Sequence, residues 1–166
     1  MKSFTDNRGE AWDIELNIGA AIRIKSRLEI DVENLVKFGP GNQPEDVSTL
    51  EKIASDSILL FNIIYTLCEN QVKERKLTQE DFAARFDGNA IEAATDALLD
   101  EIVNFSRPAK RKVLSKLRQI SKDYQAKAGE QLDRILADPK FEESINTELE
   151  KTLPKLSQNA PASSEA

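Results

Sequence analysis

The feature that most constrains the fold is the segment Ile58–Val72, in which apolar residues occupy nearly every helical face between Ile58 and Leu67. A helix that is apolar on all sides has to be buried by its neighbours, because any uncovered face would lie against water. Asp56 stands just before the segment and is a favoured N-cap residue. We therefore expect a central helix here, with other helices packed around it.

Further helices are expected wherever apolar residues recur three and four positions apart. Most of these segments follow a residue whose side chain can cap a helix or a proline that suits a first helical turn. One of them is a short helix after Asp31 that carries Val32, Leu35, Val36 and Phe38. The expected helices begin close to Asn17, Asp31, Asp46 or Ser48, Asp56, Thr78, Asp87, Arg107 and Asp138.

The N-terminal segment has a different period. Trp12, Ile14 and Leu16 alternate with polar residues, which is typical of a strand with one buried face. Residues 6–9 are turn-forming and follow a short strand candidate, so we expect a β-hairpin with Phe4 near Trp12. Two strands alone are only marginally stable, so this hairpin must pack on helices or gain a strand from a partner.

The fold class predicted from these patterns is mainly α, a multi-helix bundle with a short N-terminal β-hairpin. The hairpin and the first short helices should occupy residues 1–38. A loop rich in glycine and proline at residues 39–45 predicts a linker, because both residue types disfavour continuation of a helix. The bundle would then extend over residues 46–153, and the small, polar residues 154–166 predict a disordered tail.

The composition argues against an enzyme. The chain has no histidine and a single cysteine, Cys68, so it lacks the Ser-His-Asp and Cys-His arrangements and the usual ligand sets of zinc. Cys68 lies in an apolar helical context, and we interpret it as a small buried hydrophobic residue rather than a nucleophile. No calcium-binding loop is apparent. We expect no catalytic residue, no metal and no cofactor, although chemistry by carboxylates alone is not excluded.

Localisation follows from the absence of long apolar stretches. No window approaches the roughly 18 consecutive apolar residues of a membrane-spanning helix. The N-terminus has no apolar leader segment. We expect a cytosolic protein without membrane contact.

The net charge of −6 disfavours general binding to nucleic acid. The charges are divided, however: the charged side chains of residues 87–104 are all acidic, and those of residues 107–127 are basic except for Asp123. The acidic segment, with Glu92, Asp96 and Asp100, could form a docking surface, but pairing with the basic segment within the fold is the favoured interpretation. Nucleic-acid binding by the basic segment is disfavoured, because its consecutive cations Lys110, Arg111 and Lys112 fan around the helix and do not share one face.

The last two helices carry one-sided apolar stripes. A short chain must either fold such stripes into its core or offer them to a partner, and the sequence leaves both alternatives open. If they are offered, a partner would bind there, together with the aromatic residues of the hairpin. The candidate partner-binding residues are Phe4, Trp12, Leu132, Ile135, Phe141, Ile145 and Leu149.

Several segments together resemble a known family. They are Lys2–Trp12, Asn17–Ile22, Ile63–Cys68, Leu77–Phe82 and Asp87–Leu99. In combination they are similar to small proteins of tailed bacteriophages and prophages of the kind assigned as tail assembly chaperones. The resemblance covers about residues 2–105, and its motifs are structural rather than catalytic.

The resemblance implies a non-catalytic phage protein made in the bacterial host cytoplasm. Such chaperones are thought to coat the long tape-measure protein until tail-tube subunits polymerise around it, and they are absent from the finished particle. The partner would be the tape-measure protein or another tail protein, and self-association is also compatible with the stripes. A structural tail or neck component, whose hairpin adds to a neighbour's sheet, is the main alternative. A regulatory module that binds nucleic acid is a third.

Overall fold

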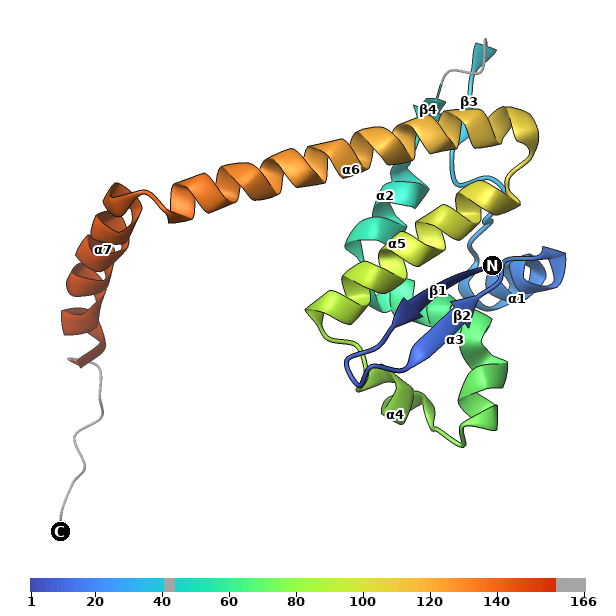
Figure 1. Cartoon of the computed structure of the whole chain (residues 1–166), viewed down its shortest axis with the longest axis horizontal. Helices are drawn as coiled ribbons and strands as arrows, with labels where there is room; N and C mark the ends of the chain where they lie inside the picture. The colour runs from blue at the N-terminus through green and yellow to red at the C-terminus, as the bar shows by residue number, and fades with distance from the viewer. Residues whose placement is uncertain (41–43, 158–166) are drawn as a thin grey trace. The chain divides into compact units, whose positions relative to one another are not determined.

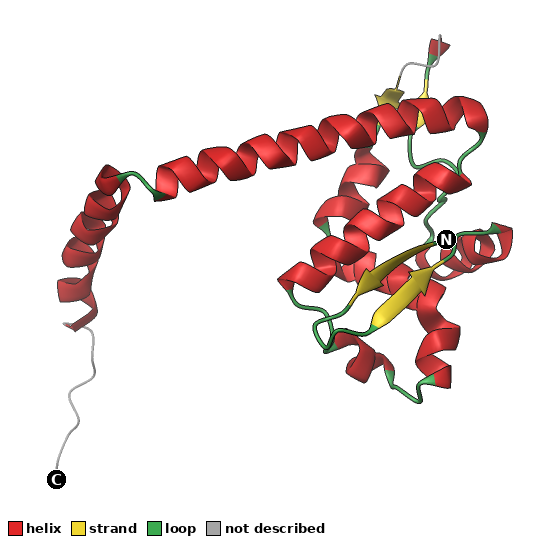
Figure 2. Cartoon of the chain, viewed as in Figure 1, coloured by secondary structure: helices red, strands yellow, loops and turns green. Residues whose placement is uncertain are grey.

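The computed structural model describes residues 1–40 and 44–157. Over these residues the fold is mainly α with a short N-terminal hairpin, as expected (Figures 1 and 2). The described helices are α1 (Ile18–Leu28), α2 (Ser48–Ser55), α3 (Ser57–Glu74), α4 (Gln79–Ala83), α5 (Gly88–Phe105), α6 (Pro108–Leu136) and α7 (Pro139–Ser157).

Two units make up the chain: residues 1–118, and residues 119 onward. Helix α6 begins in the first unit and continues into the second.

The hairpin pairs β1 (Lys2–Thr5) with β2 (Ala11–Ile14) in antiparallel register, and Phe4 lies directly opposite Trp12. Gly9 in the connecting turn has φ of +80°, a conformation that costs glycine little because it has no Cβ. The hairpin packs on α5 and α3, and α5 lies alongside β1 in Figure 1. Packing on helices therefore supplies the support that two strands need.

The predicted caps are confirmed at several helix ends. Asn17 accepts a hydrogen bond from the amide of Ala20, Asp56 accepts from two amides of the first turn of α3, and Asp87 accepts from the amide of Ala90. Thr78 and Asp81 form a capping box at the start of α4, with the hydroxyl and the carboxylate each accepting an amide of the other residue. Each cap satisfies backbone donors that the helix itself leaves unpaired.

The helix predicted after Asp31 is wrong. Asp31 accepts amide hydrogen bonds from Glu33 and Asn34, through its carboxylate and its carbonyl, but the turn goes no further. The chain instead enters β3 (Lys37–Phe38), which pairs with β4 (Pro44–Asp46). Short apolar runs do not distinguish a helix from a buried turn, and here Val32, Leu35 and Val36 are buried without helical structure.

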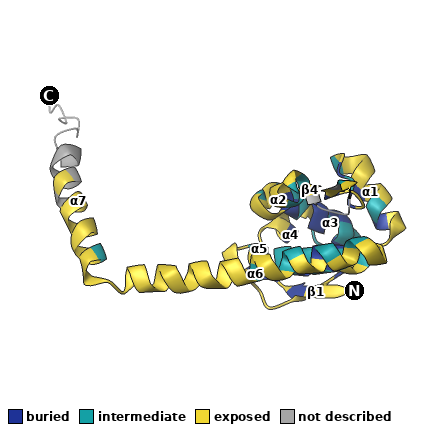
Figure 3. Cartoon of the chain, turned by 90° about the horizontal axis from the view of Figure 1, so that it is seen from above, coloured by how far each residue is buried: buried dark blue, intermediate teal, exposed yellow. Residues whose placement is uncertain are grey.

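A single hydrophobic core joins the hairpin to the helices of residues 1–118 (Figure 3). Helix α3 is central, as expected, and buries Leu60, Ile63 and Ile64 together with Cys68 and Val72. Because β1, β2 and α1 contribute to this same core, the boundary predicted at residues 39–45 does not separate two domains. Residues 41–43 of that loop lie outside the described residues.

The predicted bundle over residues 46–153 ends early. Leu114 is the last buried residue in the described part of the chain, so the second half of α6 and the described side chains of α7 add no core. Of the tail predicted at residues 154–166, residues 154–157 belong to α7 and residues 158–166 lie outside the described part. None of the described helices is long and apolar enough to span a membrane.

Candidate partner-binding surface

The second half of α6 carries an apolar stripe that no described side chain of its own unit buries. We define the α6 stripe as Ile120, Tyr124, Ala128, Leu132 and Ile135, which recur four, four, four and three positions apart and so share one helical face. All five side chains are exposed, with Tyr124 at 74% and Leu132 at 55% of their full accessible surface. Leu136 extends the apolar surface at the end of the helix and is 52% exposed.

Helix α7 carries a matching face. We define the α7 stripe as Phe141, Ile145 and Leu149, spaced four residues apart. Ile145 and Leu149 are 44% and 50% exposed, and Phe141 is half-buried. In Figure 3 the outer part of α6 and the described side chains of α7 are almost entirely coloured as exposed. Exposed apolar residues that line up along a helix in this way are typical of surfaces that bind a partner.

The seven candidate residues chosen from the sequence therefore divide into two groups. Leu132, Ile135, Ile145 and Leu149 are exposed on the two stripes, with Phe141 at their edge. Phe4 and Trp12 are buried, at 4% and 0% exposure, so the folded chain cannot present them to a partner. Ile120 and Tyr124 were not among the candidates, although the same helical spacing identifies them.

Trp12 and Phe4 are covered by an aromatic cluster that only the tertiary fold assembles. The rings of Trp12 and Phe82 lie 4.5 Å apart, and those of Phe4 and Phe86 lie 5.5 Å apart. The guanidinium of Arg75 sits 3.9 Å above the centre of the Trp12 ring, a cation–π contact. The hairpin aromatics thus anchor β1 and β2 to α3 and α4.

The outer edge of β2 is also covered. Gln71 exchanges two hydrogen bonds with the backbone of Asp13, at 3.1 and 2.7 Å, and Arg75 donates to the carbonyl of Ala11 at 2.7 Å. These side chains of α3 and its C-cap take the place of a neighbouring strand. Addition of a partner's strand at this edge would have to displace them, which argues against sheet extension at β2.

A buried polar network beneath the hairpin turn was missed by the sequence analysis. The Asp6 carboxylate accepts from the Trp12 indole Nε1 at 2.9 Å, from the Arg85 guanidinium at 3.1 Å and from the amides of Arg8 and Glu10. Arg85 also pairs with Glu10 at 2.8 Å. The side chains of Asp6 and Arg85 are 0% and 6% exposed, so the network lies inside the fold and does not form a binding surface.

The charge of Asp6 is maintained by these donors. Burial alone would raise the pKa of its carboxyl, but the hydrogen bonds from Trp12, Glu10, Arg85 and Arg8 more than offset that effect and hold the pKa below its usual range. Asp6 is therefore ionised at neutral pH. Its function in this arrangement is to tie the turn of the hairpin to the segment after α4.

The acidic and basic segments pair in the fold, as the favoured interpretation expected. Arg118 on α6 bonds to Asp96 and to Asp100 on α5, the latter at 3.1 Å. Arg111 donates to backbone carbonyls at the end of α5, and Lys110 donates to the Glu33 carbonyl and the Asn34 side chain. Basic side chains at the start of α6 therefore hold that helix against residues 1–118, which further disfavours a phosphate-binding role.

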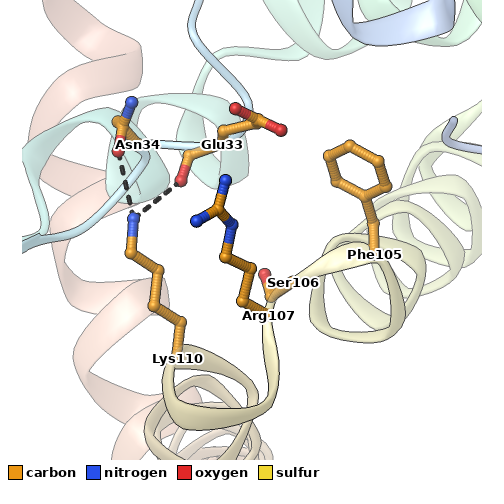
Figure 4. Close-up of a pocket in the computed structure, with 6 residues that line it drawn as sticks. All are labelled: Glu33, Asn34, Phe105, Ser106, Arg107 and Lys110. Carbon is orange, nitrogen blue, oxygen red and sulfur yellow. Dashed lines mark hydrogen bonds between the residues drawn. The ribbon is translucent and has the colours of Figure 1, made fainter. Parts of the chain in front are cut away.

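A cavity of about 260 Å³ lies where Lys110 crosses to the loop before β3 (Figure 4). Figure 4 shows Lys110 and Arg107 pointing toward Glu33 and Asn34, with Phe105 at the far side. Lys110 donates to the Glu33 carbonyl and to the Asn34 side chain across the cavity, as the two dashed lines show. These contacts join α6 to the loop before β3, so we interpret the cavity as structural.

The described residues offer neither a reactive thiol nor a cluster of metal ligands. Cys68 is buried, and burial raises the pKa of its thiol to about 12, so it stays protonated at neutral pH. No group of three or more Cys, Asp or Glu side chains in the described part of the chain is placed to hold a metal ion. The strongest candidate site is thus the pair of exposed apolar stripes.

Comparison with known proteins gives no assignment: no family model matches the chain, and no curated protein or solved structure matches it.

Proposed function

We propose that this chain is a non-catalytic tail assembly chaperone of a tailed bacteriophage or prophage, acting in the bacterial host cytoplasm. It binds the tape-measure protein and keeps that long helical protein soluble until the tail tube forms around it. The family assignment rests on the sequence resemblance of residues 2–105. The manner of binding rests on the structure of the second unit.

One observation carries the binding proposal: the α6 and α7 stripes are exposed although the chain has a well-packed core elsewhere. An amphipathic helix of a partner can lie along such a stripe and bury its own apolar face. The binding surface is separate from the core of residues 1–118, so the chain can engage and release a client without unfolding. A transient chaperone requires that separation.

The proposal is tested by expressing the full chain together with the tape-measure protein of the phage or prophage that encodes it. We expect the tape-measure protein to become soluble and to co-purify with the chain. The double substitution Ile135→Gln and Leu149→Gln removes one apolar residue from each stripe and should weaken this complex at least about tenfold. Binding is measured by co-purification and by titration with a soluble fragment of the client.

The matched control is Ile58→Gln, which removes an apolar side chain that is 76% exposed but belongs to α3 in the first unit. It should leave client binding unchanged. Equal loss of binding in the control and the stripe variant would show that the stripes are not the contact surface. Mass spectrometry of purified phage particles tests the assignment itself, because abundant chain in mature virions would indicate a structural tail or neck component instead.

A further inference from the structure

We infer that the α6 and α7 stripes of one chain are covered, in the absence of a client, by the α7 and α6 stripes of a second copy. This symmetric pairing is independent of the tape-measure proposal, because it concerns the chain alone. It also gives both exposed stripes an occupant at once. The inference rests on the connection between the helices, their lengths and the order of charges beside the stripes.

The connection between α6 and α7 leaves the stripes uncovered within one chain. Only Ala137 and Asp138 separate the two helices, and both are already engaged by the helix ends. The amide of Ala137 continues the α6 pattern by donating to Asp133, while Asp138 accepts from the amides of Lys140 and Phe141. With both residues held in this way, the stripes stay exposed in the single chain.

The two helical segments match in length and register. Residues 119–136 of α6 and residues 139–157 of α7 each span about five turns. If they are aligned antiparallel with Ala128 opposite Leu149, Leu132 falls opposite Ile145 and Leu136 opposite Phe141. A two-fold axis then forms the same contact twice, since α7 of the first copy meets α6 of the second.

The charges beside the stripes are complementary in this same register. Lys127 directly precedes Ala128 and Glu148 directly precedes Leu149, so in the antiparallel pair they lie on the same side and face each other. Within each α7, Glu148 already pairs with Lys151 at 3.1 Å, so the contact between chains extends that pair into a network of alternating charge.

The mass of the full chain in solution without client tests the inference, measured by light scattering over a series of concentrations. We expect a dimer that dissociates on dilution. Lys127→Glu and Glu148→Lys should each raise the dissociation constant about fivefold, because each places like charges together at two symmetric positions. The double variant restores opposite charges and should return to within about twofold of the unsubstituted chain.

Cysteine pairs test the register and show whether the α6 stripe of one chain contacts the α7 stripe of the other. Mixing a chain that carries Ala128→Cys with one that carries Leu149→Cys should give a disulfide-linked dimer on mild oxidation, while each variant alone should give little. Trp12, the single tryptophan, is buried in the first unit and reports that this unit remains folded in every variant. A mass of one chain at all concentrations, a mass above two chains, or equal cross-linking in the single variants would overturn the inference.

Discussion

Among single residues, Asp6 has the most demanding position, because its carboxylate is fully buried beside a guanidinium that is itself almost fully buried. Charge burial is tolerated only when the ion is paired and its remaining acceptor sites are filled. Four donors from three different parts of the chain meet that requirement. Removal of the charge would leave Arg85 without its buried counter-ion.

Asp6→Asn should therefore destabilise residues 1–118 by about 3 kcal/mol, although the amide keeps the shape of the carboxylate. Urea unfolding followed by Trp12 fluorescence measures the change. Glu10→Gln is the matched control, since Glu10 pairs with the same arginine at 2.8 Å but is 46% exposed. Glu10→Gln should lower the free energy of unfolding only slightly. A decrease equal to that of Asp6→Asn would show that the effect of Asp6→Asn does not come from burial of the charge.

The same variant has a defined pH dependence. The pKa of Asp6 is lowered in the folded chain, so its stabilising effect is fully present above the ordinary carboxyl pKa and is lost as pH falls through the folded value. The difference in unfolding free energy between the unsubstituted chain and Asp6→Asn should narrow between about pH 5 and about pH 2. A difference that stayed constant over this range would contradict the assigned ionisation.

At the level of secondary structure, the sequence predicts those elements whose signals are local. Asn17, Asp56 and Asp87 cap the expected helices because a cap needs only its own residue and the next few amides. The segment after Asp31 was wrongly expected to be helical because its true partner is a strand beyond the 39–43 loop. The partner strand β4 begins only six residues after Phe38, but the helical spacing of the apolar residues before it gives no sign of that pairing.

The candidate site also combines residues that local spacing predicts with residues whose exposure depends on the whole fold. The stripes of α6 and α7 follow from helical spacing, so Leu132 and Ile145 could be chosen from the sequence alone. Whether a given apolar residue is free depends on the whole fold, which is why Trp12 was wrongly placed on a binding surface. The contact between Asp6 and Arg85 spans 79 residues and had no signal in the sequence.

The local stability of the exposed half of helix α6 can be tested at Gly129. Gly129 lies within the helix outside the stripe, and a Cβ at this position would meet no atom within 4 Å. Gly129→Ala should therefore stabilise the helix by about 1 kcal/mol, through propensity and a less flexible unfolded chain. Slower amide hydrogen exchange over residues 119–136, without change in the unfolding of residues 1–118, is the expected result. Unchanged exchange there would mean that the segment is already held by other contacts.

At the level of the whole molecule, core and binding surface belong to different parts of the sequence. Residues 1–118 contain every buried side chain of the described part, including the aromatic cluster and the Asp6 network. Residues 119–157 contain exposed helix with apolar stripes. The contacts that stabilise the fold are thus concentrated in the first unit, whereas the second unit carries apolar stripes that a partner could cover.

A chain ending at Arg118 should accordingly fold by itself, with an unfolding free energy within about 0.5 kcal/mol of the full chain, because no buried contact is lost. A peptide of residues 119–157 should be only weakly helical when dilute, since isolated helices of this length are marginal in water. Its helicity should rise with concentration as the stripes find partners. Circular dichroism of the peptide and urea unfolding of the shortened chain measure the two effects. A shortened chain that fails to fold would show that the second unit supports the first, whereas a peptide fully helical at high dilution would show that its stripes are satisfied within one chain.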